Sequence, residues 1–442
     1  MKRTIEMMMM VVVMVLVAIF LVSSLSSCSK DEDDSKKSTL INEDPDDPKP
    51  VDPEDNKPKY IQLTRAELQL VNSNNDFAFN LFRRSSDPMK DQIVSPISIT
   101  YALGMLNNGA AGETLAQINK TLGFGDAGAD GINTFCQKML TEAPNLDKLT
   151  KVMIANTIFM NKDYILNADF VKKANNYYQA QPETRDFNDG MTLDVINHWA
   201  SDHTDKMVEK VLSPDEFSPQ AVSYLLNAIY FKGNWTHKFE AGETRMEVFN
   251  HADTDKNQIE VPMMHQKEHF QYTENDLCQA VALPYGNGAF RITLLLPREG
   301  KKVSDVLSTL TAENWKNNYR NMQTANVDLK LPRFESNTSL NLVDIMSSLG
   351  MPNAFDPWKA EFPDFCNVPT YISLMKQVAR IKLNETGTEA AAVTVIEMEF
   401  ASSGSIPEIR NVVFHANRPF LYVINEVTTG TIFFIGQYMG NQ

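Results

Sequence analysis

The order in which helical and strand-like patterns follow one another is the strongest constraint on the fold of this chain. From Tyr60 to Gln442 the sequence contains no internal repeat and no linker long enough to divide it into two domains. Apolar residues recur first at three- and four-residue steps, the period of an amphipathic helix, in residues 67–86, 95–124 and 193–212. Strand-like segments follow at residues 221–235, 279–286, 290–297, 326–335 and 419–439. Helices first and strands later, without regular alternation, predict one large α+β domain.

Two local signals mark where elements begin and turn. Ser95 followed by Pro96 is typical of a helix start, because a hydroxyl caps the first turn and proline fits its first position. Thr429 and Gly430 separate two strand-like runs near the end of the chain. This pair therefore predicts the turn of a hairpin.

The charge balance of the chain argues against a nucleic-acid partner. The 442 residues carry a formal net charge of −15, and no basic block or basic stripe interleaved with aromatic residues occurs. Nucleic-acid binding relies on clustered Lys and Arg that neutralise phosphates. We therefore expect no nucleic acid among the partners.

The first 27 residues have the pattern of a targeting segment. Lys2 and Arg3 supply positive charge, and the apolar run 7–22 is followed by small residues. The run is short for a full membrane span, and the segment ends in Leu25-Ser26-Ser27-Cys28, which resembles the bacterial lipobox. In that motif the cysteine is acylated and becomes the mature N-terminus. We predict a lipoprotein signal peptide at residues 1–27 and a lipid-modified Cys28; a bare transmembrane anchor is the alternative.

Residues 28–59 form an acidic, proline-rich segment that is almost empty of apolar residues. Such a segment cannot bury a core, so we interpret it as a tether between the lipid anchor and the domain at residues 60–442. The acidic run directly after Cys28 resembles the export signal of bacterial lipoproteins on the outer face of the outer membrane. A merely solvated linker is the alternative. The predicted location is therefore the outer membrane, with the domain exposed at the cell surface.

No motif in the chain supports catalysis, a cofactor or a metal. His265, Glu268 and His269 match the HxxEH string of inverted zinc peptidases, but Pro262 and the strand-like run after them argue against a helix. We therefore expect the two imidazoles not to face one way and no zinc to bind. Nucleophile-elbow, phosphate-loop and dinucleotide motifs are absent. Cys136, Cys278 and Cys366 lack paired spacing and are predicted to be buried small hydrophobes.

The segment at residues 388–401, TEAAAVTVIEMEFA, alternates like a strand but is unusually rich in alanine at its start. One face carries only uncharged residues, whereas the other becomes acidic at its far end. Gly387 precedes the segment, and a Ser- and Gly-rich run follows it. Small side chains suit a strand that must slide between strands that are already paired. The pattern alone leaves open an ordinary edge strand between flexible ends.

A resemblance to the serpin family decides between these interpretations. The run NETGTEAAAVT at residues 384–394 resembles the hinge of the serpin reactive loop. The strings SPISITYALGMLNNGAAGETLAQI, LLNAIYFKGNWTHKFE, LKLPRFE, LGMPNAFDP and FHANRPFLYVINEVTTGTIFFIGQ follow the family's order. The resemblance extends from about Tyr60 to the C-terminus. It implies the serpin fold, in which helices pack around three β-sheets and a reactive loop is exposed.

The resemblance also implies a function, the covalent trapping of proteases by a suicide inhibitor that is not itself an enzyme. Cleavage lets the segment before the cut enter the large sheet as a new strand, and the acylated protease is carried with it. The hinge residues that carry over are Glu385, Gly387, Thr388, Glu389, Ala390, Ala391 and Ala392. Thr388, Ala390 and Ala392 would enter on the buried side, where a charge would be costly, and Glu389 would face outward.

Other positions carry over from the family's sheet-opening region. Trp235 matches the tryptophan where loop insertion starts, and Ser95, Ser98 and Asn227 match a polar cluster under the centre of the sheet. The family commonly has a histidine in this cluster, whereas this chain has Gln377. Glutamine can form hydrogen bonds there but cannot ionise.

The scissile bond is predicted from its family position, sixteen residues after Glu385. This count gives Ala401, with Ser402 on the far side of the bond. Alanine suits a protease with a small apolar pocket, so elastase-like serine proteases are the expected partners, with cysteine proteases as a second class. We expect a monomer. The alternative function is a non-inhibitory serpin-fold binding protein at the cell surface.

Overall fold

The computed structural model describes residues 56–251, 258–319, 322–388 and 409–440, which all belong to one compact unit, residues 46–442. The predicted signal peptide, the lipidated Cys28 and most of the tether lie outside the described residues. The same holds for six predicted loop residues that follow the hinge turn, namely Glu389, Ala390, Ala391 and Ala392 and the two residues of the predicted bond, Ala401 and Ser402.

Most helices of the described chain lie in its first half, as predicted. They are α2 (Arg65–Ser85), α3 (Pro96–Asn107), α4 (Gly112–Thr121), α5 (Gly128–Glu142), α6 (Ala168–Tyr178), α7 (Thr192–Asp202), α8 (Val303–Thr309), α9 (Ala312–Tyr319) and α10 (Val343–Leu349). None of the helices in the described ranges is long and apolar enough to cross a membrane.

Side chains fix where the first two helices begin. Thr64 caps α2 and accepts a hydrogen bond from the Glu67 amide at 3.2 Å, while the Glu67 carboxylate accepts one from the Thr64 amide at 2.7 Å. Ser95 caps α3 and accepts from the Ser98 amide at 3.4 Å, with Pro96 in the first turn. The predicted start at Ser95-Pro96 is confirmed, because the cap satisfies a backbone donor that the helix leaves free.

Six strands form the first sheet, in the order β10-β11-β12-β4-β2-β3. They are β2 (Thr150–Asn161), β3 (Glu183–Arg185), β4 (Ser223–Asn234), β10 (Phe334–Asn341), β11 (Lys376–Asn384) and β12 (Gly387–Thr388). β12 has only two residues and runs antiparallel to both of its neighbours. The two long strands β4 and β11 therefore run parallel to each other.

The second sheet has nine strands and two halves that share β6. One half runs β1-β15-β14-β8-β7-β6, and the other joins β5, β6, β9 and β13. The strands are β1 (Gln92–Val94), β5 (Arg245–Phe249), β6 (Ile259–Glu274), β7 (Cys278–Tyr285), β8 (Phe290–Pro297), β9 (Gln323–Pro332), β13 (Asn411–His415), β14 (Phe420–Glu426) and β15 (Ile432–Tyr438). The three expected sheets thus correspond to the six-stranded sheet and to these two halves, and the predicted α+β class is confirmed.

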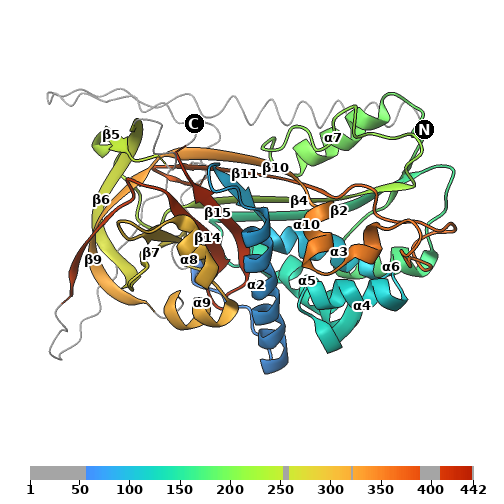
Figure 1. Cartoon of the computed structure of the whole chain (residues 1–442), viewed down its shortest axis with the longest axis horizontal. Coiled ribbons are helices and arrows are strands. Elements are labelled where there is room, and N and C mark those ends of the chain that lie inside the picture. The colour runs from blue at the N-terminus through green and yellow to red at the C-terminus, as the bar shows by residue number, and fades with distance from the viewer. Residues whose placement is uncertain (1–55, 252–257, 320–321, 389–408, 441–442) are drawn as a thin grey trace, which may run out of the picture. The chain divides into compact units, whose positions relative to one another are not determined.

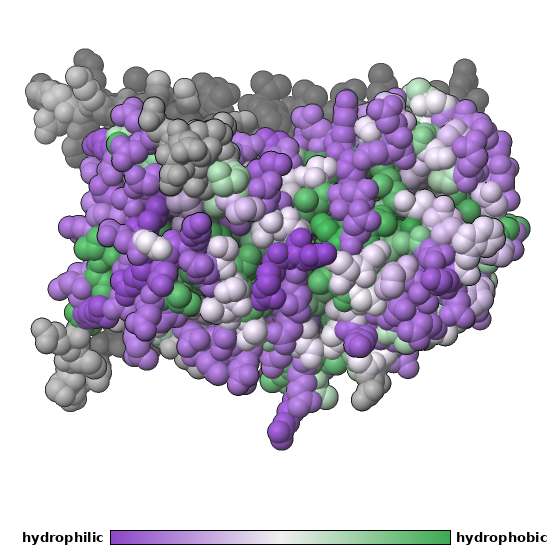
Figure 2. Space-filling view, viewed as in Figure 1, coloured by the Kyte–Doolittle hydropathy of each residue, from purple (hydrophilic) through white to green (hydrophobic). Residues whose placement is uncertain are grey.

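Helix α3 is the centre of the core. All of its residues except Ala102 are buried, and Ser95 at its start donates a hydrogen bond to the Phe433 carbonyl of β15 at 2.8 Å. Figure 1 shows the six-stranded sheet nearly edge-on, with α7 on one side and α3 to α6 on the other. Both faces of this sheet are therefore covered by helices. On the face shown in Figure 2, hydrophilic residues predominate, and a band of hydrophobic residues runs across the half that holds α3 and α10.

Two predicted helices are longer in the sequence pattern than in the structure. The segment 95–124 breaks between α3 and α4 at residues 108–111. The segment 193–212 stays helical only to Asp202, because Asp205 and Lys206 have φ values of 51° and 64°, in the left-handed region that a helix cannot continue through. Apolar spacing persists beyond this point because residues 203–222 pack against the sheet as an irregular segment.

The three described cysteines are free and buried, as predicted.

Candidate functional site

The candidate site is the strand position between β4 and β11 in the six-stranded sheet, where the described residues supply only the start of a strand. No ladder joins these two strands directly in the described part of the chain; only the two residues of β12 lie between them. Gly387 pairs with Asn384 of β11 on one side and with Asn234 of β4 on the other. The chain therefore leaves β11, turns back and starts a new strand, of which Gly387 and Thr388 are the described residues. We call the position between β4 and β11 beyond Thr388 the slot.

The turn that leads into the slot is held by Asn384 and Trp235. The Asn384 side-chain oxygen accepts hydrogen bonds from the Thr386 amide at 3.1 Å and from the Gly387 amide at 3.2 Å. The Trp235 amide donates to the Thr386 carbonyl, and its indole N–H donates to the Asn384 carbonyl, both at 2.9 Å. Trp235 lies at the start of the slot, where the resemblance predicted it.

Gly387 occupies a position that no other residue can take without a shift of the backbone. Its φ is 153°, in the range that favours glycine, and a Cβ atom there would overlap the carbonyl oxygen of Gly233. Glycine is therefore required where the returning chain pairs with β4.

Thr388 enters the sheet on its buried side. Its hydroxyl shares a hydrogen bond of 2.8 Å with the Tyr285 hydroxyl, and Thr388 is 2% exposed. Tyr285 stacks on Trp235 with ring centroids 4.6 Å apart, and burial raises the pKa of its phenol well above the usual range. The first contact on the inward side of the slot is therefore a hydrogen bond between two neutral hydroxyl groups. It carries no charge, which agrees with the uncharged inward face that the sequence predicted.

Glu385 is the one charged residue of the hinge turn that the structure describes, and it is buried with partners. Its carboxylate accepts a hydrogen bond from the Thr244 hydroxyl at 2.8 Å and lies 3.3 Å from the Arg333 guanidinium. Its carbonyl accepts from the Phe239 amide at 2.9 Å. These contacts fix the outer corner of the turn to the connection between β4 and β5 and to Arg333, which lies between β9 and β10.

The predicted polar cluster is present, and helix α3 organises it. Gln377 of β11 accepts from the Ser95 amide at 3.0 Å and donates to the Ser95 carbonyl at 2.8 Å. The Ser98 hydroxyl donates to the Asn227 side chain of β4, and Asn227 donates in turn to Asn156 of β2 at 2.7 Å. The structure thus brings Ser95, Ser98, Asn227 and Gln377 to the floor of the slot. The two strands are each tied to α3.

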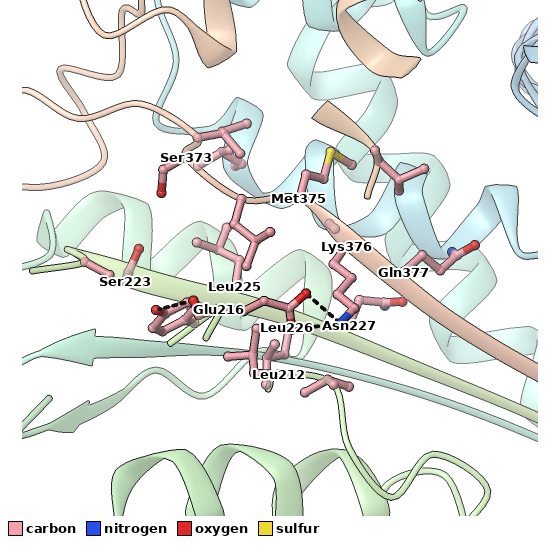
Figure 3. Close-up of a pocket in the computed structure, with 18 of the residues that line it drawn as sticks. Leu212, Glu216, Ser223, Leu225, Leu226, Asn227, Ser373, Met375, Lys376 and Gln377 are labelled. Carbon is pink, nitrogen blue, oxygen red and sulfur yellow. Dashed lines mark hydrogen bonds and ion pairs between the residues drawn. The ribbon is translucent and has the colours of Figure 1, made fainter. Parts of the chain in front are cut away.

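Below the hinge, the slot opens into a cavity of about 690 Å³. Ile99 and Leu103 of α3 line its floor, and residues 223–229 of β4 and 369–378 line its walls. Residues 203–222, which connect α7 to β4 and which we call the strap, close it from the opposite side. Figure 3 shows Leu225 and Met375 on facing walls, with Glu216 of the strap bonded to Lys376. A mostly apolar cavity open along a strand edge suits an extended segment of chain.

The chain is anchored on the second sheet at Arg410, just before β13. Strand β13 pairs with β9, and the Asn326 amide donates to the Arg410 carbonyl at 3.0 Å. Arg410 also forms an ion pair with Glu274. The hydrogen bond from the Tyr272 hydroxyl, supported by Arg410 and Arg298, lowers the pKa of Glu274 to about 2. The carboxylate therefore stays charged and anchors the chain where β13 begins.

The HxxEH string lies in β6, so it is part of a strand, as expected. The expectation that its imidazoles face different ways is wrong, because residues four apart in a strand share a face. What excludes zinc is their separation of about 13 Å along the strand. His265 instead bonds Asp328 at 3.0 Å, and His415 of β13 bonds the same carboxylate oxygen at 3.2 Å. The described residues contain no cluster of three side chains suited to a metal ion.

Sequence reasoning missed three contributors to the site. Tyr285 and Asn384 hold the hinge, and Glu216 reaches across the mouth of the cavity to Lys376 at 2.8 Å. Asn384 could have been found, since an asparagine three residues before a glycine often closes a turn. The pair Glu216–Lys376 joins residues 160 positions apart, and no local pattern signals it.

Comparison with known proteins gives these features a family context. The family model described as serpin (serine protease inhibitor) matches residues 72–440. Serpin B6 of Macaca fascicularis is 30% identical over 375 residues, which cover 84% of this chain and 98% of that protein. The crystal structure of the thermophilic serpin tengpin in its native state has 27% identity, covers 87% of this chain and 97% of that chain, and gives a TM-score of 0.74. Thyroxine-binding globulin in complex with thyroxine has 26% identity, covers 84% and 99%, and also gives 0.74.

Replacing Gly387 by alanine should expel the start of the new strand from between β4 and β11. The added methyl group cannot coexist with the Gly233 carbonyl, and the positive φ adds strain of about 1–3 kcal/mol. We expect a lower urea midpoint and faster amide exchange at Trp235. Gly242→Ala is the matched control, because a Cβ atom there meets nothing within 4 Å. Equal behaviour of the two variants would contradict the role assigned to Gly387.

The Glu274 anchor should make stability depend on pH in the acid range. Its folded-state pKa, about 2, lies below the ordinary value of 4.5, so its contribution is complete above pH 4.5 and is lost as pH falls toward 2. We expect Glu274→Gln to lower the free energy of unfolding near pH 6, by at most about 3 kcal/mol, and to have little effect near pH 2. Glu260→Gln, at an exposed position of the same strand, serves as control. Urea unfolding between pH 2 and pH 6 measures this; a constant difference would refute it.

Proposed function

Because this chain belongs to the serpin family of serine protease inhibitors, we propose that it traps proteases by inserting its cleaved loop into the slot. In this proposal the protease serine oxygen attacks the Ala401 carbonyl carbon, and the Ala401–Ser402 amide bond breaks. Ser402 leaves as a new amino terminus, and the protease remains bound to Ala401 as an ester. Residues 389–401 then enter between β4 and β11 and carry the protease with them.

The register at β12 carries this proposal. Thr388 lies opposite Gly233 of β4 and Leu383 of β11 in antiparallel pairs. Continued for thirteen residues, the same register would bring Ala401 beside Gln220 and Thr370. Both residues line the end of the cavity, so the segment up to the predicted bond matches the length of the slot. An extended strand of that length spans about 43 Å.

The chemistry of the inward face also fits the slot. In this register the inward residues after Thr388 are all apolar except one. The exception, Thr394, would lie beside Asn227 and Gln377, the polar side chains of the slot floor. A hydroxyl there would find hydrogen-bond partners instead of being buried without any. Ile396 would lie between Leu225 and Met375, which face each other across the cavity.

Insertion can hold the protease only if the filled sheet is more stable than the open one. In the described part of the chain, β4 and β11 have no strand partner in the slot beyond Thr388 and the apolar walls of the cavity are unfilled, and both features cost stability. A new central strand would pair both edges and fill the cavity. The uncleaved chain would then be a kinetically trapped state, which cleavage releases.

The residue before the bond suggests the class of protease. The short apolar side chain of Ala401 suits a small, shallow pocket, so we propose elastase-like serine proteases as targets, with cysteine proteases as a second class. We further propose that the inhibitor acts as a monomer at the outer surface of the outer membrane, held by a lipid on Cys28.

The alternative function is that of a binding protein without inhibitory activity. Similarity to thyroxine-binding globulin, which was crystallised with thyroxine, favours that alternative.

A charged residue on the inward side of the hinge should convert the inhibitor into a substrate. The full chain is mixed with an elastase, and denaturing gels and mass spectrometry follow the products. Wild type should give a band at the summed mass and release a peptide that begins at Ser402. Thr388→Arg should give only cleaved chain, because an unpaired charge cannot be buried beside Tyr285. Glu389→Arg, one residue on and predicted to face outward, is the control and should keep the complex. Cleavage of wild type without any complex would favour the binding-protein alternative.

The proposed anchor has its own test. Replacing Cys28 by alanine should release the chain from the membrane fraction, because a lipid chain supplies about 0.8 kcal/mol of membrane affinity for each buried CH₂ group. Mass spectrometry of the N-terminal peptide should show an acylated cysteine in wild type. Ser29→Ala, next to it, is the control. Membrane retention of the Cys28→Ala variant would point to a transmembrane anchor instead.

A further inference from the structure

The strap crosses the slot on the side opposite α3 and is fastened to both walls. Its Ser218 amide donates to the Tyr224 hydroxyl of β4 at 2.7 Å. On the other wall, the Lys376 ammonium of β11 lies 2.8 Å from both carboxylate oxygens of Glu216. Glu216 is oriented by the Ser213 amide and hydroxyl at 2.8 and 3.0 Å. One ion pair therefore joins the strap to the β11 wall, and Figure 3 shows it between Glu216 and Lys376.

The position of Lys376 places this pair above the path of the inserting strand. Gln377, the next residue, faces α3, so Lys376 faces the strap. In the register set at β12, Lys376 and Leu226 would flank Val395, whose side chain would point toward the strap. A strand cannot pass this point without displacing the strap or parting Glu216 from Lys376.

The ion pair between Glu216 and Lys376 is strong enough to change the rate of strand insertion and exposed enough to break. The Lys376 and Glu216 side chains are 19% and 30% exposed, and the ion pair with Lys376 lowers the pKa of Glu216. Its carboxylate is therefore charged at neutral pH. Pairs of this accessibility change an equilibrium or a rate by up to about fivefold.

We propose that the Glu216–Lys376 pair is a clasp that sets the rate of loop insertion; this inference rests on the proposed trapping function. After acylation, insertion competes with hydrolysis of the ester. The clasp slows entry of the strand beyond Val395, so it lowers the share of encounters that end in a trapped protease. It also keeps the uncleaved chain from closing its own slot.

The test measures the ratio of trapped complex to cleaved chain when the full chain meets an elastase, at a pH where wild type gives both products. Lys376→Met keeps the apolar stem and removes the charge, and Glu216→Gln keeps the shape. Both should raise the ratio by about fivefold. The doubly exchanged variant, Glu216→Lys with Lys376→Glu, should return toward the wild-type ratio. Melting curves of the uncleaved variants verify that they are folded.

A second ion pair supplies the matched control. Lys151 of β2 lies 3.5 Å from Asp205 of the strap, so it ties the strap to the sheet without crossing the slot. Lys151→Met should leave the ratio unchanged. An unchanged or lower ratio in the clasp variants, or an equal rise in Lys151→Met, would overturn the clasp. Failure of wild type itself to form any complex would refute the trapping function instead, so the two failures are distinguishable.

Discussion

The structure depends on the way the first turn of α3 holds two strands apart. Gln377 fixes β11 to the Ser95 backbone, and Asn227 fixes β4 to Ser98, so neither strand needs the other for support. A helix that is almost wholly buried therefore supports a sheet in which only the two described residues of β12 lie between β4 and β11. Because Gln377 is neutral at every pH, the support on the β11 side does not change with protonation.

The other parts of the site lie around the two strands that α3 supports. The turn at Asn384, the glycine at 387 and the stack of Trp235 on Tyr285 hold the start of a third strand between β4 and β11. The strap closes the opposite side of the slot through Glu216 and Lys376. An apolar cavity and unpaired strand edges raise the energy of this state, so a segment that can fill them has a driving force to do so.

The sequence predicted the parts of the site that depend on local chemistry. The cap at Ser95, the glycine hinge and the inward threonine follow from backbone geometry and alternation, and the family resemblance assigned Trp235 and the polar cluster. The extent of α7 was not predictable from apolar spacing, because the left-handed residues Asp205 and Lys206 end the helix although its period continues. Contacts such as Glu216–Lys376 and His265–Asp328 depend on how distant segments pack, and their residue types alone do not indicate them.

The most direct test of the account is amide hydrogen exchange in β4 and β11 before and after cleavage at the predicted bond. Entry of residues 389–401 as a strand would pair both facing edges. Exchange in residues 223–231 and 376–381 should then slow by about tenfold or more, while exchange in β14 stays unchanged. Unchanged or faster exchange along the slot after cleavage would show that the loop does not enter the sheet and would contradict the account.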